Sequence, residues 1–438
     1  MSIKKKKIAI IGAGYTGMIL AKELSKKYMV DLIEAKNDIG GMTATFNAYG
    51  TNLEYFYRHI FKSDKYAIDL IKELSLDDEM EWNETRMGYY VKDRGSYDFG
   101  TPISLLKFKP LDLWSKFRFG MGFIKIKLIR NYHKLEGVTA DAWLSKNLNK
   151  KSYECIFKPL LISKFGEAYK DISMVWLWNK LVARNSSSKK NGEALGYLKG
   201  SYQKLTDKLK QLLKDNGVNI ILGTRITRIY KTKNGKYKLD GLTTNYDKVV
   251  MTTPLPFVKE LVSDLNINKK YINKLSSIDY TAAKVLVMFL KKSFMPYYWL
   301  NIGDSDIPFG GLIEHTNMQD KKLYGNNYVL YVSNYMYKNN PLYKMNKEKL
   351  FNEYLPYLKK VNPQFDKKWI KRLEVYNEDY AQQIVKTNYY KNIPELKIPS
   401  EELYVASMAQ IYPQDRGMNN AIGLGLKVAD LIISKDKK

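Results

Sequence analysis

Short apolar runs and helical spacing follow one another at the start of the chain. Residues 8–11 are all apolar, which is typical of a parallel strand that is buried on both faces. From Met18 to Tyr28 the apolar residues fall on or near one helix face, and Met29 to Ile33 is a second short segment that is apolar except for Asp31. The pattern predicts a strand, a helix and a strand that ends at the acidic Glu34.

Similar patterns return in two later parts of the chain. An amphipathic helix is predicted over 201–213, and a second helix is predicted to begin near Asn419. The strands predicted beside these helices span 218–222, 246–253 and 403–406. Buried strands that alternate with helices predict the α/β fold class.

Three glycines stand between the first strand and the first helix and form a G-x-G-x-x-G motif. Gly12 permits a tight turn, Gly14 lets the backbone approach a pyrophosphate, and Gly17 lets the helix pack closely on the strand. The N-terminus of the helix offers unpaired N–H groups and a positive dipole end to phosphates. Glu34 can accept hydrogen bonds from a ribose diol. These features in this order predict a dinucleotide-binding site.

The residues after Glu34 distinguish among dinucleotide-binding proteins. They read AKNDIGGMTATF and place Gly40 and Gly41 a few positions downstream. This segment resembles the extended motif of the FAD-dependent amine oxidase superfamily, which includes protoporphyrinogen oxidase and phytoene desaturase, with UDP-galactopyranose mutase as a more distant relative. Members usually carry Arg directly after the diglycine, whereas this chain has Met42. The departure affects one expected cofactor contact.

The resemblance implies that FAD is bound by three separate segments. The residues implied in the first segment are Gly12, Gly14, Tyr15, Thr16, Gly17, Glu34, Ala35, Gly40, Gly41, Met42 and Thr43. The middle of the chain is expected to contribute Ile226 and Thr253. The residues implied near the C-terminus are Asp415, Arg416, Gly417, Met418, Asn419 and Ala421. This last loop contains no Cys or His that could bond covalently to the flavin, so we expect noncovalent FAD.

The resemblance also implies the domain organisation. We expect a Rossmann-like FAD-binding domain built from residues 1–84, 196–264 and 396–438 and interleaved with an α+β substrate domain. Two insertions would form the substrate domain, with a helical lobe over 85–195 and a mixed-sheet lobe over 265–395.

Composition limits the function classes. The chain of 438 residues is 45% hydrophobic and has one cysteine, Cys155, so a disulfide framework is excluded. Its three histidines lack the spacing of metal ligands, and we expect no metal site. No apolar run approaches the roughly 18 residues of a membrane span, and we expect a cytoplasmic protein.

The charge balance is strongly basic. The chain has 72 Lys and Arg against 45 Asp and Glu, a formal net charge of +27. Such an excess favours anionic partners, although a lysine-rich composition spread over the whole surface would give the same value. Because no nucleic-acid-binding motif is visible, we expect a small-molecule substrate and no nucleic acid. The sequence leaves the oligomeric state open.

Four residues are candidates for catalysis. Lys284 resembles the position at which family members hold a water beside the flavin, although an exposed lysine at the start of a strand would look the same. His315 could transfer protons near neutral pH and Glu314 could orient it, but a structural histidine fits equally well. His59 follows the diglycine in the loop that lies near the flavin in the family.

Residues 105–134 combine aromatic and basic side chains. Trp114, Phe117 and Phe123 alternate with lysines and arginines, and Asp112 is the one acid of the segment. Such a composition suits a helix that lies on an anionic membrane surface. The alternative is a pair of core helices with lysines that extend toward the solvent.

The leading functional hypothesis is an FAD-dependent oxidoreductase that removes hydride from a C–N or C–C bond. Its substrate would be an amphipathic or phosphorylated small molecule. The alternative is a non-redox flavoenzyme, such as a sugar mutase or isomerase. A third possibility is an inactive flavin-binding scaffold, which the Met42 replacement suggests.

Overall fold

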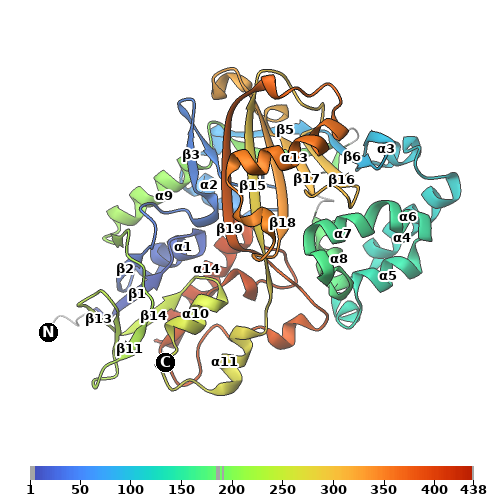
Figure 1. Ribbon diagram of the computed structural model, residues 1–438. Helices are drawn as coiled ribbons and strands as arrows, with labels where there is room; N and C mark the ends of the chain where they lie inside the picture. The colour runs from blue at the N-terminus through green and yellow to red at the C-terminus, as the bar shows by residue number, and fades with distance from the viewer. Residues whose placement is uncertain (1–4, 184–187, 190–191, 437–438) are drawn as a thin grey trace.

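The chain contributes strands from three distant parts of the sequence to one parallel sheet. The computed structural model describes residues 5–183, 188–189 and 192–436 (Figure 1). The sheet has the order β10-β2-β1-β14-β20 and every neighbouring pair is parallel. Its strands are β1 (Lys7–Ile11), β2 (Met29–Ile33), β10 (Asn219–Ile221), β14 (Lys248–Met251) and β20 (Leu403–Val405). Their apolar runs are buried because helices and loops cover both faces.

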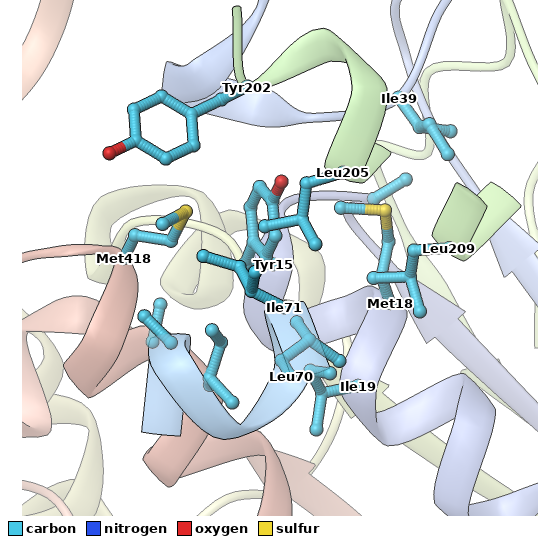
Figure 2. Close-up of a cluster of buried hydrophobic side chains, with 14 of the residues drawn as sticks. Tyr15, Met18, Ile19, Ile39, Leu70, Ile71, Tyr202, Leu205, Leu209 and Met418 are labelled. Atoms are coloured by element: carbon cyan, nitrogen blue, oxygen red, sulfur yellow. The ribbon is translucent and has the colours of Figure 1, made fainter. Parts of the chain in front are cut away.

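Helices from the same three parts pack together beside this sheet. They are α1 (Tyr15–Leu24), α2 (Lys65–Glu73), α9 (Gln203–Asp215) and α14 (Met418–Lys435). Figure 2 shows Tyr15 of α1 within the apolar cluster that they form, together with Leu205 of α9 and Met418 of α14. The cluster holds the starts of α1 and α14 close together, although they are separated by most of the chain.

A second sheet has seven strands in the order β19-β15-β18-β17-β16-β6-β7. The pair β16–β6 is parallel and the other pairs are antiparallel, so the sheet is mixed. Its strands are β6 (Met87–Val91), β7 (Gly95–Asp98), β15 (Tyr280–Leu290), β16 (Trp299–Gly303), β17 (Gly311–Glu314), β18 (Tyr328–Met336) and β19 (Ile370–Gln383). The helices α12 (Pro341–Lys344) and α13 (Lys347–Val361) follow β18, and α13 packs on β15 and β19.

A helical lobe lies at the side of the molecule away from the N-terminus (Figure 1). Its helices are α3 (Pro102–Lys107), α4 (Leu113–Leu128), α5 (Ala140–Asn147), α6 (Lys150–Ser152), α7 (Lys158–Phe165) and α8 (Met174–Ala183). Side chains of the N-cap residues Thr101, Asp112, Thr139 and Asn149 accept backbone hydrogen bonds at the starts of α3, α4, α5 and α6.

Smaller elements connect these layers. The short strands are β3 (Thr45–Ala48), β4 (Thr51–Glu54), β5 (Met80–Thr85), β8 (Ser188–Lys189), β9 (Gly192–Leu198), β11 (Ile229–Lys231), β12 (Tyr237–Leu239) and β13 (Asn245–Tyr246). The short helices α10 (Leu255–Leu261) and α11 (Lys269–Ser276) lead from the parallel sheet toward β15.

The predicted α/β class with a parallel sheet is confirmed. The predicted helical segment over 85–195 differs from the structure at both ends. It begins with β6 and β7, which belong to the mixed sheet, and ends in β9, which pairs with β5. The first predicted helix also begins earlier, at Tyr15, and ends at Leu24.

Candidate functional site

The first glycine turn is held by contacts that exclude larger residues. A Cβ atom on Gly17 would lie 1.9 Å from the carbonyl oxygen of Gly12, so α1 can start this close to β1 only with glycine there. The diglycine packs on the same turn. Gly41 has a φ of +59°, and a Cβ on it would lie 3.1 Å from the Cα of Gly14. The two glycine loops therefore form one wall.

The two glycine loops border a cavity of about 350 Å³, which we call the cofactor cavity. All the residues predicted to bind FAD line it except Gly17, Asp415 and Asn419. Glu34 also lines it, and its Oε2 accepts a hydrogen bond from the Ala13 backbone N–H at 2.8 Å. Its Oε1 accepts another from the Lys36 N–H at 3.0 Å. Each oxygen keeps a further lone pair for a ribose hydroxyl.

Two helices begin at the cofactor cavity. The N-cap residues are Gly14 for α1 and Gly417 for α14, and among the described residues no side chain caps either helix. The Thr16 hydroxyl joins the two starts by donating a hydrogen bond to the Ala421 carbonyl oxygen at 3.1 Å. Uncapped N–H groups and two positive dipole ends therefore face the same space, which suits an anionic group.

These features fit FAD. Glycine loops and helix starts would hold a diphosphate, and Glu34 would hold the adenosine ribose. The Thr253 hydroxyl also lines the cavity, is buried, and finds no hydrogen-bond partner within the described ranges. Such a group is expected where a bound molecule completes the hydrogen bonding.

A second cavity of about 250 Å³ adjoins the first. Both are lined by the same group of residues, the shared wall, which consists of Met42, Arg58, Arg416, Gly417 and Met418. The helical lobe contributes Lys164 of α7 and Lys180 of α8 to the second cavity. The mixed sheet contributes Trp299 of β16 and Tyr335 of β18. The second cavity thus lies where all three layers meet.

The second cavity is lined by more positive than negative charge. Its cationic residues are Arg58, Lys164, Lys180 and Arg416, and its carboxylates are Asp64 and Asp415. Burial alone would raise the pKa of Asp415, but the charges of Lys180, Lys164 and Arg416 hold that pKa well below its usual value. Burial raises the pKa of Asp64 to about 6, still below neutral pH.

The two arginines of the shared wall are held differently. Arg416 donates from Nε to Gln382 Oε1 at 2.9 Å and from Nη2 to the Tyr335 hydroxyl at 2.6 Å. The Nε of Arg58 is buried, and no described residue accepts its hydrogen bond. Burial, and next the charge of Arg416, lower the pKa of Arg58. An anion in this place would relieve the repulsion between the two guanidinium groups.

Of the four predicted catalytic residues, the structure brings His59 to the second cavity. Its Nδ1 lies 3.0 Å from the Tyr298 hydroxyl oxygen, and its ring packs edge-on against Phe61 and Trp299.

Lys284 does not reach either cavity, contrary to its predicted role. Its neighbours Ala283 and Val285 on β15 line the second cavity, so the alternation of the strand turns Lys284 to the opposite face. There its Nζ donates hydrogen bonds to the carbonyl oxygens of Tyr343 and Met345, both at 2.7 Å. Burial lowers the pKa of Lys284. These contacts indicate a structural lysine.

Glu314 and His315 are likewise turned into the core. Glu314 Oε2 accepts the backbone N–H groups of Phe294 and Met295 at 2.9 and 2.8 Å, and burial raises its pKa to about 7. His315 Nε2 lies 2.7 Å from the Tyr324 hydroxyl oxygen, and burial lowers its pKa to about 3. Neither residue lines either cavity, and both are fully buried, contrary to the predicted catalytic role of the pair.

Sequence reasoning missed Lys164, Lys180, Trp299 and Tyr335. They lie in the two insertions, where no motif marks them, and tertiary packing alone brings them together. Among the described residues, no group of three or more His, Cys, Asp or Glu is placed to hold a metal ion. In the same part of the chain, no helix is long and apolar enough to cross a bilayer.

Comparison with known proteins gives one family match. The model of the family described as flavin-containing amine oxidoreductase matches residues 15–433. The chain is also similar to a coproporphyrinogen III oxidase of Bacillus subtilis (strain 168), with 23% identity over 302 residues. That alignment covers 60% of this chain and 63% of the relative, so the match spans less than two thirds of the relative's length.

Solved structures share the fold along the whole chain. A protein of Exiguobacterium sp. 255-15, proposed to be a protoporphyrinogen oxidase, has a TM-score of 0.77 and 16% identity, and the match covers 98% of this chain and 99% of that one. Reduced UDP-galactopyranose mutase has a TM-score of 0.76 and 14% identity, with 98% and 96% covered. At these identities the likeness shows the fold alone.

Proposed function

The chain belongs to the family of flavin-containing amine oxidoreductases, and we propose that it binds FAD noncovalently and removes hydride from a C–N or C–C bond of a small anionic molecule. The observation that carries this proposal is the shared wall. A cavity suited to a dinucleotide and a second cavity with different chemistry share Arg58, Arg416 and Met418 in their lining. This arrangement supports a cofactor in one cavity and a substrate in the adjoining one.

The flavin would accept the hydride, so the protein has to bind and orient the two molecules and exclude water. The start of α14 and Arg416 would place positive charge beside the cofactor. In the second cavity, Tyr57 packs edge-on against Trp299, with ring centres 4.9 Å apart. These two nearly perpendicular rings offer apolar surface to the substrate.

The charge of the second cavity supports an anionic substrate. Four cationic side chains line it against two carboxylates, and one of these, Asp415, is paired with Lys180. A protonated amine would meet repulsion there, whereas a phosphate or carboxylate would find several donors. The substrate we propose therefore carries at least one acidic group beside the bond that is oxidised.

The same charge also favours a second candidate, a redox-neutral flavoenzyme. Paired arginines and lysines are suited to the diphosphate of a nucleotide sugar, the kind of ligand that a sugar mutase handles. In that case the reduced cofactor would act without net electron transfer.

Two measurements test these proposals. Mass spectrometry of the molecules released on denaturation should detect FAD in equimolar amount, and the small molecules released with it identify substrate candidates. A folded, colourless protein that does not take up added FAD would refute the proposal.

The second measurement mixes the FAD-loaded protein with candidates in the absence of oxygen. Bleaching of the flavin by a phosphorylated or carboxylated compound, without added reductant, supports the oxidoreductase. Turnover of a nucleotide sugar that begins after reduction with dithionite supports the mutase. Bleaching by simple amines but by none of the anions would overturn the proposed substrate class.

A further inference from the structure

Helix α4 is apolar on two opposite faces, and one of them is exposed. Ser115, Phe119, Gly122 and Ile126 are buried in the helical lobe at the spacing of one helix face. The residues of the opposite face repeat at intervals of three and four and are Leu113, Phe117, Met121, Ile124 and Leu128. Their exposed fractions are 80%, 57%, 38%, 51% and 73%.

Neighbouring residues extend this stripe. Trp114 is 63% exposed, and Ile103 and Leu106 of α3 are 43% and 67% exposed. We call the stripe and these three residues the α3–α4 face. It contains eight of the fifteen large apolar side chains that are exposed in the described part of the chain. Apolar surface gathered in this way is typical of an interaction site, whereas single exposed apolar residues are ordinary.

The border of the α3–α4 face is basic. Lysines and arginines accompany it along α3, α4 and the intervening loop, among them Lys107, Lys109, Lys116, Lys125, Lys127 and Arg130. Asp112 is the single acid in residues 103–130. Its carboxylate caps α4 through the Ser115 N–H and pairs with Lys151 at 2.9 Å, so it adds little negative charge to the border.

We propose that the α3–α4 face docks the protein on a membrane surface that contains anionic lipids. Apolar and aromatic side chains along one side of a helix, with lysines at the edges, are suited to insertion at the level of the headgroups. The 16 residues of α4 form a rod about 24 Å long that can lie flat in that plane. Phosphate headgroups complement the basic border.

A second copy of the chain is a poorer occupant. Two α3–α4 faces placed against each other would bring two basic borders together, and the resulting repulsion would oppose the apolar contact. In Figure 1 the helical lobe lies at the edge of the molecule, away from the N-terminus and the parallel sheet. A flat surface could therefore reach the lobe without meeting the rest of the protein.

Docking has a consequence for the second cavity. The lobe that carries the α3–α4 face also supplies Lys164 and Lys180 to that cavity. Attachment through α4 would hold this wall of the second cavity near the lipid surface, which suits an amphipathic substrate with an acidic headgroup. The docking itself depends neither on the cofactor nor on the proposed reaction.

The test is sedimentation of the full chain with lipid vesicles. We expect binding to vesicles of phosphatidylcholine mixed with phosphatidylglycerol, weaker binding at high salt, and little binding to phosphatidylcholine alone. The combined variant Leu113→Asn, Phe117→Asn and Leu128→Asn should lower the partition coefficient at least roughly tenfold. Its matched control is Met29→Asn, Tyr230→Asn and Tyr390→Asn, which changes exposed apolar residues elsewhere and should bind like the wild type.

A second pair of variants isolates the charge. Lys107→Glu with Lys127→Glu should weaken binding to the anionic vesicles, whereas Lys233→Glu with Lys238→Glu, the same change at another exposed place, should have a smaller effect.

Trp114 fluorescence should shift to shorter wavelength on binding, by comparison with a Trp114→Phe variant. Absence of vesicle binding overturns the proposal, as does equal binding by the apolar variant and its control. A wild-type dimer that this apolar variant converts to monomers, with no vesicle binding, would instead assign the face to a second copy.

Discussion

Arg58 donates a hydrogen bond from Nη2 to the backbone carbonyl oxygen of Met42 at 2.5 Å. The contact brings a guanidinium group to the residue that follows the diglycine, where members of the superfamily usually carry arginine. Both residues belong to the shared wall, and the buried Nε of Arg58 is left without a partner in the described structure. A positive charge is therefore present at this point of the site, although it comes from a later loop.

Replacement of Arg58 by Met should lower the midpoint potential of the bound flavin. A flavin that takes up two electrons gains negative charge, and a nearby buried cation stabilises that form. Loss of the charge should shift the potential by about −30 mV or more, since 30 mV corresponds to about 1.4 kcal/mol for two electrons. Spectroelectrochemical titration measures the shift.

Two further variants assign the effect. Arg58→Lys keeps the charge and should restore most of the potential, while Arg94→Met removes an exposed arginine and should leave the potential unchanged. If Arg58→Met binds flavin with an unaltered midpoint potential, the role of Arg58 is to hold the loop of Met42, and its charge does not stabilise the reduced cofactor.

Gly14→Asp should abolish flavin binding while the protein remains folded. A Cβ on Gly14 has room, since the nearest atom, the Cα of Gly41, would be 4.0 Å away. The new carboxylate would, however, lie where the glycine loops and the start of α1 are suited to a diphosphate, and the like charges would repel. The measurement is the ratio of flavin absorbance to protein.

The control for this change is Gly137→Asp, because a Cβ at Gly137 meets nothing within 4 Å and the residue lies in the helical lobe. That variant should keep its yellow colour. Stoichiometric flavin in folded Gly14→Asp would show that the cofactor cavity has been assigned to the wrong ligand.

The sequence was informative where a residue type is required by local geometry. Gly17 and Gly41 are needed because backbone atoms approach them within a few ångströms, and a motif of fixed spacing reveals such positions. Glu34 directly follows the strand Met29–Ile33, whose last two residues are apolar. For the same reason the strands of the parallel sheet were predicted close to their observed bounds.

Placement across a sheet could not be derived from sequence in the same way. Lys284 lies in β15, where residues 281–290 are all buried, so no alternation of polar and apolar residues marks the face that meets the cavity. Lys164 and Lys180 reach the second cavity because the helical lobe packs beside the mixed sheet, and spacing within a helix does not encode that contact. In α4, apolar residues occur on both the buried and the exposed face, so the sequence alone does not show which face is exposed.

Lys284→Met should destabilise the protein without lowering the rate of flavin reduction. The carbonyl oxygens of Tyr343 and Met345 would lose a buried donor, which costs about 1–3 kcal/mol. Urea unfolding measures the loss of stability, and rapid mixing with substrate or dithionite measures the rate of flavin reduction. Lys291→Met, a change of an exposed lysine just after the same strand, should alter neither. Slower flavin reduction in Lys284→Met at full flavin content would restore the catalytic role.

Glu314 should make the stability of the protein depend on pH. Burial raises its pKa from the usual 4.5 to about 7, and its Oε1 has no hydrogen-bond partner in the described ranges. Between these two values the unfolded chain has released the proton while the folded chain still holds it. The stabilising contribution is therefore complete below pH 4.5 and is lost as the pH rises through 7.

The variant Glu314→Gln cannot ionise at this position and should lack that loss. From pH 4.5 to 7, the free energy of unfolding of the wild type should fall by up to about 3 kcal/mol relative to the variant, at 1.36 kcal/mol for each unit of pKa difference. Urea unfolding of both proteins across this range measures the difference, and the exposed Glu348→Gln serves as a control for the loss of one carboxyl group. Parallel stability curves for wild type and Glu314→Gln would mean that Glu314 is ionised in the folded protein. In that case a cation or a water molecule, in addition to the two backbone N–H groups, would have to stabilise its carboxylate.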